Sequence, residues 1–595
     1  MNFNSIRNLL VNKFTSLRSN ELVFGVILSV TVGVAAGFGA VLFWQAIKWT
    51  NWLFFFGGTQ ALPFLGDYYV ILLPAAGGLL VGIIIRYLAN EVKGEGPPEV
   101  IEAYSVKGGR IHWKVTPFKI LASAISIGSG GSVGREGPIV QIGASAGSSI
   151  AQFFKLNDEW VKTLLLCGAA GGISATFNAP LAGIIFALEV VAGNFINPRF
   201  GYIVISSVSA NVIAKIFLFT GEHTSSFSLP QYSIVNYLEL IPYAVLGILI
   251  AVSGIAFVRF FYKTEEVFAS LKIPQVIKPA LGGLAIGITG YFFPEIFGVG
   301  YGIHYDSTGA LIPFGALDQA LTENLAFTTL LGLFFLKMLS TSLTLGSGGS
   351  GGVFAPSLFI GAMAGGAFGY GVNMILPSAT ASYGAYALVG MGAFFAVVCR
   401  GPITAIIILF ELTLNYTLIL PLMIAVVVAT TLARSFTPES IYTERLLKKG
   451  INILAINQSN PMKEITVSRI MTRNFPTVTD TMPVQELSDK LKKSGHHGFP
   501  VVDQNGELTG VVTVTDLVSA MQRGSAENLK VADIATRNPK VCYPGQTLHD
   551  VMVRIGTDVG RIPVVDKDNP KKLLGVLRRH NIVDAYTRSI TSRDK

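Results

Sequence analysis

Long apolar runs interrupted by glycine occupy the chain as far as Arg434. The runs are Leu22–Ile47, Tyr69–Leu88, Val161–Gly193, Phe200–Phe219, Leu238–Phe261, Lys278–Phe293, Leu325–Leu345, Gly352–Leu376 and Tyr386–Arg434. One crossing of a membrane needs about 20 apolar residues, so several runs are too long for one helix and others are too short. Helix breaks are tolerated at membrane depth only where protein or water satisfies the freed backbone groups. The pattern therefore predicts a polytopic α-helical membrane protein with helices of unequal length, some of them broken.

The apolar region contains an internal repeat. Three pairs of segments match: 74–82 with 279–287, 119–132 with 337–350, and 178–189 with 400–411. In the second pair a Gly-Ser-Gly-Gly-Ser sequence begins at both Gly128 and Gly346, each preceded at the same spacing by Lys119 or Lys337. Glycine-interrupted segments at corresponding positions of two halves are typical of transport proteins with a substrate site near the midplane. The repeat therefore predicts two pseudo-symmetric halves that build one such site.

Charge distinguishes the first glycine segment from its repeat. Gly128–Pro138 places Arg135 and Glu136 within sequence that otherwise reads as membrane-embedded, whereas the second copy has apolar residues. Charge at that depth is costly and usually functional. The backbone N–H groups of a glycine-rich turn can bind a small anion. We therefore expect an anion pathway with a carboxylate standing in it.

A more polar region follows the apolar one. Residues 435–460 read as a linker, after which segments 467–472, 499–503 and 508–512 return as 531–536, 562–566 and 573–577. Each copy reads as a helix, short strands around a Pro-Val-Val-Asp turn, and a closing helix. This region therefore predicts a compact α+β pair.

Composition supports the membrane class and limits the partners. The chain has 51% hydrophobic and 14% charged residues, with a mean hydropathy of +0.54, far from an ordinary soluble domain. Its net charge of +9 comes without an arginine-rich helix or an aromatic platform, so we expect membrane lipid and no nucleic acid as a partner. Basic residues before Leu22 favour a cytoplasmic N-terminus. The three distant cysteines predict inert thiols and no disulfide framework.

These motifs resemble the CLC chloride channel and transporter family, and the polar region resembles the tandem CBS domains that often follow its membrane part. The resemblance rests on Gly134-Arg-Glu-Gly-Pro138, Gly352-Val-Phe-Ala-Pro356 and Tyr442, which occur in the family's order. It implies a homodimer with inverted repeats and one anion pathway per subunit, in a plasma membrane, with the CBS domains cytoplasmic. Short loops suit a bacterial inner membrane. The expected parts are an N-terminal segment 1–21, membrane repeats 22–226 and 227–442, a linker 443–463, and CBS domains 464–523 and 529–587.

The resemblance also implies roles for single residues. Glu136 matches the gating glutamate, whose carboxylate occupies an anion site when ionised and leaves it when protonated; an ion pair with Arg135 or a helix cap is the alternative. The anion ligands are expected to be backbone amides and one hydroxyl, from Gly134, Arg135, Glu136, Gly137, Val353, Phe354 and Tyr442. Core packing is the alternative for Val353 and Phe354. The alternative for Tyr442 is a place in the aromatic belt at a membrane interface.

Two positions depart from the family pattern. Glu95 replaces a serine that donates a hydrogen bond to the central anion, and an ionised carboxylate has no donor. Glu95 is therefore neutral, or turned away, or the central site is altered. Val190 stands where proton-coupled members have a second consecutive acid, the internal proton relay, and valine carries no proton. Its neighbour Glu189, matched by Glu411 in the other half, is expected to be a structural carboxylate at a helix terminus or interface.

The CBS motifs leave nucleotide binding open. Thr513 and Asp516 match the residues that bind the ribose of an adenine nucleotide, ATP, ADP or AMP, while Asn581 replaces the corresponding Asp in the second copy. Structural CBS pairs without a ligand are the alternative. The adjacent His496 and His497 point in different directions on a helix or strand, so we expect an exposed pair and no metal site.

The sequence favours a passive chloride channel gated by Glu136 and tuned by nucleotide, requiring no cofactor. A proton-coupled chloride antiporter of the same fold is the nearest alternative, left open because Glu95 offers another proton route. A CBS-regulated divalent-cation transporter would need clustered acids, and the membrane part offers isolated ones. An enzyme is not expected, because no Lys-Ser or Lys-Thr ends either glycine run as a phosphate-binding loop requires.

Overall fold

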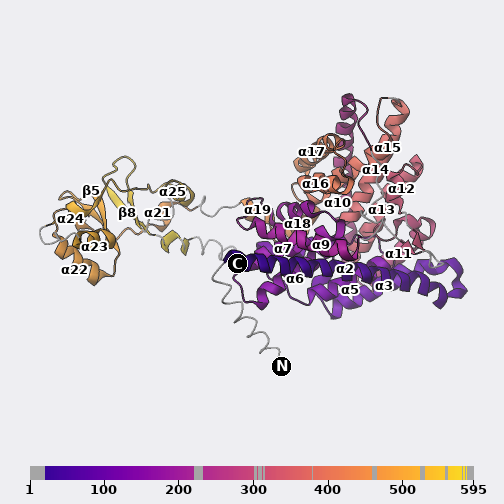
Figure 1. Ribbon diagram of the computed structural model, residues 1–595, viewed down its shortest axis with the longest axis horizontal. Helices are drawn as coiled ribbons and strands as arrows, with labels where there is room; N and C mark the ends of the chain where they lie inside the picture. Colours follow the sequence, from indigo (N-terminus) through magenta and orange to yellow (C-terminus); the bar gives the residue numbers. More distant parts are fainter. Residues whose placement is uncertain are drawn as a thin grey trace, which may run out of the picture. The chain divides into compact units, whose positions relative to one another are not determined.

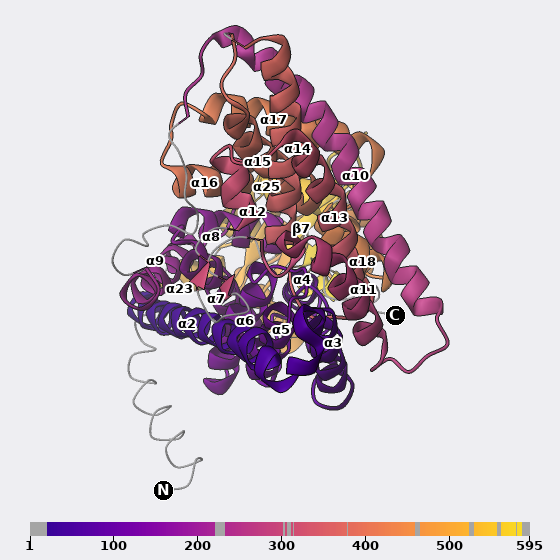
Figure 2. The same cartoon turned by 90° about the vertical axis from the view of Figure 1, so that its right-hand side faces the viewer.

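The computed structural model describes residues 21–219, 232–300, 304–305, 311–312, 315–377, 379–458, 465–522, 529–555, 561–578, 580–582 and 584–585. It divides into two compact units, Met1–Leu454 and Ala455–Lys595. The expected cytoplasmic N-terminal segment lies almost wholly outside the described residues. Within the first unit, the helices of the two sequence halves gather into two neighbouring groups (Figures 1 and 2).

The first unit is helical. Its α-helices are α2 (Glu21–Ala61), α3 (Tyr69–Tyr87), α4 (Pro97–Ser105), α5 (Val115–Gly128), α6 (Glu136–Phe153), α7 (Asp158–Phe177), α8 (Pro180–Phe186), α9 (Phe200–Phe217), α10 (Leu240–Ser270), α11 (Lys278–Phe292), α12 (Ala316–Leu321), α13 (Phe327–Gly346), α14 (Phe354–Ile375), α15 (Tyr383–Cys399), α16 (Pro402–Thr413), α17 (Ile419–Phe436), α18 (Ile441–Lys448) and α19 (Ile453–Gln458). Short strands β1 (His304–Tyr305) and β2 (Leu311–Ile312) pair antiparallel. Eight helices within the described residues are long and apolar enough to cross a membrane, which confirms the polytopic helical class.

The longest apolar runs are broken, as their lengths predicted. The run that begins at Val161 ends its first helix at Asn178, and the run that begins at Tyr386 breaks at Arg400 and Leu414. All three breakpoint residues adopt left-handed backbone angles, with φ of 56°, 57° and 50°. A left-handed residue is a common way to end a helix because it redirects the chain and satisfies the last carbonyls.

Reciprocal contacts join the two halves. Helix α3 packs on α11, and glycines permit the close approach. A Cβ at Gly78 would lie 2.3 Å from the carbonyl oxygen of Pro279, and one at Gly283 would lie 2.1 Å from that of Pro74. The same residues of each repeat thus meet the same residues of the other. The two halves are pseudo-symmetric, as the repeat predicted.

The second unit is an α+β pair. Its elements are α21 (Val467–Ile470), β3 (Val478–Thr479), α22 (Val484–Ser494), β4 (Gly498–Val502), β5 (Leu508–Thr513), α23 (Val514–Gln522), α24 (Val531–Ile534), β6 (Thr536–Arg537), α25 (Leu548–Ile555), β7 (Arg561–Val565) and β8 (Leu573–Arg578). One sheet has the order β3-β4-β5-β6, with β3 parallel to β4 and the other neighbours antiparallel, and a second sheet pairs β7 with β8. The expectation of a turn at Pro-Val-Val-Asp was wrong: Pro500 lies inside β4, and the chain turns at Asp503–Gly506 instead.

The two CBS repeats exchange their first segments. Strand β6 begins the second repeat but pairs with β5 of the first, and Thr472 of the first repeat bridges Val576 of the second. The cores follow the same exchange, because Val531 packs in the first core and Val467 in the second. Each globular half of the pair therefore contains residues from both sequence repeats.

Candidate anion site

The two glycine breaks meet backbone to backbone. The N–H of Gly134 donates to the carbonyl of Gly352 at 2.7 Å, and the N–H of Gly352 donates to the carbonyl of Gly134 at 2.8 Å. Helix α6 begins two residues after Gly134, and α14 begins two residues after Gly352. The positive ends of two helix dipoles therefore face one region, which favours negative charge there.

This arrangement brings most of the predicted anion ligands together but reassigns one of them. Gly137 and Phe354 lie in the first turns of α6 and α14, and Val353 is the N-cap residue of α14. The N–H of Gly134, in contrast, is engaged by the Gly352 carbonyl. Gly134 is therefore placed in the scaffold that holds the two helix ends together, with its N–H already paired.

Glu136 is the first residue of α6, and its side chain is fully buried. A Cβ at Gly134 would lie 2.4 Å from its Oε2, so the carboxylate folds back over the glycine break. Its Oε1 is 3.8 Å from Nε of Arg135, beyond hydrogen-bond distance. The carboxylate thus stands between the helix N-termini and forms a long ion pair with Arg135.

The Phe354 side chain has a packing role. Its ring centroid lies 5.3 Å from that of Phe177, 6.2 Å from that of Phe186 and 4.2 Å from that of Phe395. This aromatic cluster fixes the start of α14. The side chain therefore packs in the core, and any contact with an anion is left to the backbone.

Tyr442 is buried, which argues against the alternative of a membrane-interface belt. The Ser440 side chain accepts hydrogen bonds from the N–H groups of Tyr442 and Thr443, at 3.2 and 3.1 Å, and so caps α18. The Tyr442 hydroxyl accepts a hydrogen bond from Sγ of Cys399 at 3.3 Å. Accepting from a thiol leaves its own O–H able to donate, as an anion ligand requires.

The loop that carries Glu95 lies against both glycine breaks. Its Gly94 exchanges backbone hydrogen bonds with the second break, through Gly349 and Gly351, each at 3.2 Å. Its Gly96 lies so close to the first break that an added Cβ would be 2.4 Å from the Gly137 carbonyl oxygen. Glu95 is therefore held directly beside the region where the helix N-termini meet.

Two buried lysines hold the corresponding loops of both halves. Nζ of Lys119 donates to the carbonyls of Val92 and Gly94, at 3.0 and 2.8 Å. Nζ of Lys337 donates to those of Ile296 and Gly298, both at 2.9 Å. In the sequence these lysines serve only to align the repeat. Their identical spacing from the two glycine breaks could have predicted that they hold corresponding loops.

The Glu95 carboxyl is directed toward Arg445, with Oε1 3.7 Å from Nη1. Glu95 lies in the loop between α3 and α4, outside the spanning helices. Burial raises the pKa of its carboxyl to about 8, while Arg445 lowers that pKa and Glu99 raises it. The Glu95 side chain is thus turned toward Arg445, and its burial favours the protonated carboxyl.

Glu189 and Glu411 each cap the N-terminus of a helix in the opposite sequence half. The Glu189 carboxylate accepts hydrogen bonds from the N–H groups of Ile403 and Thr404 at the start of α16, at 3.0 and 2.7 Å. The Glu411 carboxylate accepts those of Leu181 and Ala182 at the start of α8, at 2.9 and 2.7 Å. The expected structural role of both acids is confirmed. Each satisfies donors that a helix N-terminus otherwise leaves open.

Val190 packs close to the second half, since a Cβ at Gly401 would lie 3.0 Å from its Cγ2. Its isopropyl group can neither accept nor donate a proton. The position next to Glu189 therefore offers no proton route in this chain.

Gly96→Ala is expected to destabilise the membrane unit by about 1–3 kcal/mol, because a φ of +102° suits glycine alone. The methyl group would also meet the Gly137 carbonyl. Gly332→Ala in α13 is the matched control, because its Cβ meets nothing within 4 Å; alanine should leave stability unchanged or raise it. Thermal unfolding in detergent measures both. Equal melting temperatures would contradict the strained loop.

In the second unit, the predicted nucleotide residues make helix caps. The N–H and Oγ1 of Thr513 donate to Oδ2 of Asp516, at 2.8 and 2.7 Å, at the start of α23. Oδ1 of Asn581 accepts a hydrogen bond from the N–H of Arg578 at 3.2 Å. This contact corresponds, in the other repeat, to the one between Thr513 and Asp516. His496 is half-buried and His497 exposed. Among the described residues there is no group of three metal-binding side chains that could hold an ion.

Joined inverted halves with two helix N-termini around one buried carboxylate define a membrane transport protein for a small anion. Residues 77–434 match the family described as voltage gated chloride channel, and residues 467–523 and 531–588 match the CBS domain. The chain belongs to this CLC family of chloride channels and transporters, and it carries a CBS pair. It is a multi-pass membrane protein for anion transport.

The similar proteins include one with a channel name and others with antiporter names. A ClcB-like protein of Ralstonia nicotianae, which bears a chloride channel protein name, is 30% identical over 436 residues, 71% of this chain and 97% of its own length. The H(+)/Cl(-) exchange transporter ClcA of Vibrio campbellii is 32% identical over 455 residues, 73% of this chain and 92% of its own. The crystal structure of a slow cyanobacterial Cl-/H+ antiporter superposes with a TM-score of 0.62 at 27% identity, covering 73% of this chain and 99% of that one.

Proposed function

We propose that this protein is a proton-coupled chloride antiporter. The observation that carries the proposal is the buried Glu136 carboxylate lying over the joined glycine breaks. An ionised carboxylate there competes with chloride for the same helix dipoles, whereas a protonated one does not. The same Glu136 side chain can therefore bind a proton, or it can leave the site and allow an anion to bind there. The antiporter names of ClcA and of the cyanobacterial structure support the same function.

A passive channel is the second candidate and the one that the sequence alone favoured. Its support is Val190, which cannot relay protons, together with the name of the Ralstonia relative. The argument from Val190 concerns one position, however. Antiport requires some acid on the inner part of the pathway, and Glu95 is a buried acid beside the same glycine break.

Paired flux recording on purified protein in liposomes tests the proposal. Vesicles loaded with concentrated chloride are diluted into low chloride, and external pH and chloride are followed together with the membrane potential clamped by potassium and valinomycin. We expect chloride efflux to drive protons into the vesicles against their gradient, in a fixed ratio, and a protonophore to collapse that gradient. Chloride efflux without proton uptake would establish the channel instead.

We infer the remaining properties from the same family membership. The protein is a homodimer with one pathway per subunit, in a bacterial plasma membrane, with its N-terminus and CBS pair in the cytoplasm. An adenine nucleotide is the proposed ligand of the CBS pair. Its ribose hydroxyls would have to compete with the contact between Thr513 and Asp516, since that carboxylate already accepts two hydrogen bonds.

A further inference from the structure

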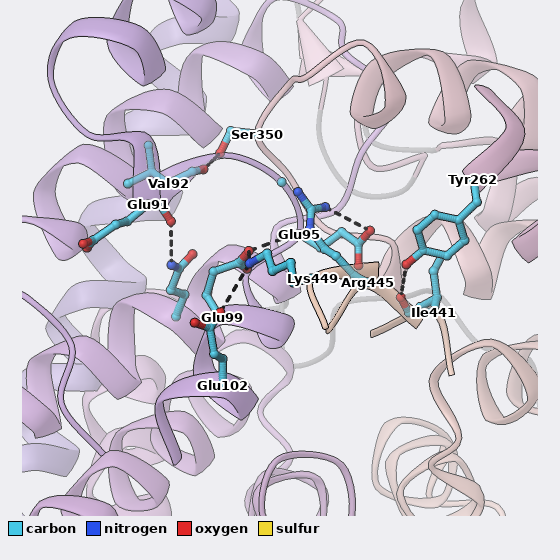
Figure 3. A network of polar contacts seen from close by, with 12 residues as sticks. Glu91, Val92, Glu95, Glu99, Glu102, Tyr262, Ser350, Ile441, Arg445 and Lys449 are labelled. Carbon is cyan, nitrogen blue, oxygen red and sulfur yellow. Dashed lines mark hydrogen bonds and ion pairs between the residues drawn. The ribbon is translucent and has the colours of Figure 1, made fainter. Parts of the chain in front are cut away.

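A ladder of alternating charges runs from Glu95 toward the surface (Figure 3). Its members, in order, are Glu95, Arg445, Glu99, Lys449, Glu102 and Lys107. Successive nitrogen-to-oxygen distances are 3.7, 3.9, 3.8, 3.3 and 2.6 Å. We call this set the acid ladder. It places three carboxyl groups in sequence, each separated from the next by one cation.

The acid ladder is buried at its Glu95 end and exposed at its Lys107 end. The Glu95 side chain is fully buried, those of Glu99 and Glu102 are 16% and 13% exposed, and that of Lys107 is 57% exposed. Glu99 and Glu102 belong to α4 and are three residues apart, so they share one helix face. Arg445 stands on α18 and Lys449 follows at its end, four residues on, which aligns both with that face. The ladder thus connects a fully buried acid to solvent.

Glu95 is the least satisfied acid of the ladder, since both of its carboxyl oxygens, and only Oε2 of Glu99, are buried without a hydrogen-bond partner among the described residues. Arg445 is too distant from Glu95 to donate. A buried ionised carboxylate without hydrogen bonds is costly, so this group readily takes up a proton. Arg445 offsets part of that cost and allows the proton to leave again. The charged or titratable groups around Glu95 are Arg445, Glu99, Glu265, Lys119, Tyr262 and Tyr442.

The inner end of the ladder reaches the gate. A Cβ at Gly137 would lie 2.2 Å from the carbonyl oxygen of Glu95, so the backbones of Glu95 and of the residue after Glu136 are in contact. Both Glu95 and Glu136 are close enough to Tyr442 to interact electrostatically with its hydroxyl. The two buried acids therefore flank one small region on the anion pathway.

We propose that Glu95 is the inner proton-transfer residue of this antiporter and that the acid ladder is its route to solvent. The inference rests on the antiport function proposed above. A proton leaves the protonated Glu136 carboxyl, crosses water in the anion pathway and binds ionised Glu95. It then passes to Glu99 or Glu102 and to bulk water. Each transfer moves one proton from a carboxyl to a carboxylate, and no electrons change place.

The assignment accounts for both departures from the family pattern together. Val190 carries no proton, and Glu189 is held as a helix cap by Ile403 and Thr404. The chain therefore lacks a relay at the usual position. Glu95, where a serine is usual, supplies a titratable group on a different element; it is fully buried, and the acid ladder connects it to the surface.

Glu95→Gln tests the relay in the liposome assay, because glutamine keeps the size of the side chain and removes its proton. We expect chloride efflux to continue while the proton-to-chloride ratio falls at least about tenfold. Glu95→Asp keeps a carboxyl and should retain measurable coupling, which a purely structural role would not predict. Glu91→Gln is the matched control: Glu91 is exposed in the same connection and outside the ladder, and its coupling should equal that of the unaltered protein.

The outcomes separate the two proposals. If the unaltered protein moves chloride without protons, the antiport function fails. If it is coupled and Glu95→Gln is coupled at the same ratio, the relay alone fails. Loss of chloride efflux in Glu95→Gln together with loss of coupling in Glu95→Asp would show that Glu95 is structural, which also overturns the relay.

Discussion

Glu136→Gln is expected to abolish chloride-driven proton uptake while chloride efflux continues without pH dependence. Glutamine has nearly the shape of glutamate but cannot ionise, so it neither carries a proton nor competes as an anion at the ends of α6 and α14. Glu136 is fully buried at these helix ends, so the substitution acts at the anion site itself. Chloride and proton fluxes recorded together between pH 4.5 and 7.5 measure it.

Glu159→Gln is the control for that substitution. Glu159 is an acid in the first turn of α7, and its side chain is 78% exposed. The control changes charge by the same amount at a helix N-terminus but far from the glycine breaks in sequence, and it should keep the full proton-to-chloride ratio. A Glu136→Gln protein that still pumps protons, or whose chloride flux follows pH as before, would contradict the gate.

Arg445→Met is expected to be the most destabilising single change in the acid ladder, by about 3–5 kcal/mol. It leaves Glu95 buried beside Glu99 without the cation that both face. Methionine has a similar length and no charge. Adding Glu95→Gln should restore part of the stability, because it removes the uncompensated buried acid. Thermal unfolding of the two proteins in detergent, compared as a double-mutant cycle, measures the coupling.

The deficit of Arg445→Met should also depend on pH. Without the cation, the already raised pKa of the Glu95 carboxyl moves higher still in the folded protein, while the unfolded carboxyl keeps its ordinary value. The folded state then binds the extra proton, so stability is highest below the unfolded pKa and falls as pH rises toward the folded one. The deficit should be smaller at pH 7 than at pH 9, because the Glu95 carboxyl of the unaltered protein, with a pKa of about 8, loses its proton only across that range. A deficit that is constant with pH would mean that packing, not charge, is lost.

The architecture was largely predictable because it depends on the backbone. Close approach of two backbone segments requires glycine, so the matching segments at Gly128 and Gly346 predicted a shared site. The mutual approach of Gly78 to Pro279 and of Gly283 to Pro74 has the same origin. Run lengths that fit no single crossing predicted the breaks in the helices, although not that Asn178 and Arg400 would make them.

Side-chain roles were less predictable, and the reason is distance along the chain. The motif at Val190 favoured a channel, although Glu95 left another proton route open. The role of Glu95 depends on its contact with Arg445, which lies at the other end of the membrane unit in sequence. Tyr442 similarly could be a belt residue or a pore residue until its burial was known. The CBS repeats also look sequential in the chain, yet β6 pairs with the sheet of the other repeat.

The sequence by itself determined the membrane class, the two homologous halves, the glycine breaks and the presence of one acid, Glu136, at the first break. These follow from local composition and periodicity, which persist whatever the packing. Only the tertiary structure decided that the N–H of Gly134 is engaged by Gly352, that Glu189 caps α16, and that Glu95 stands at the buried end of the acid ladder. Such contacts depend on separations of a few ångströms between distant segments; for Glu95 and Arg445, the packing of α4 beside α18 sets that separation.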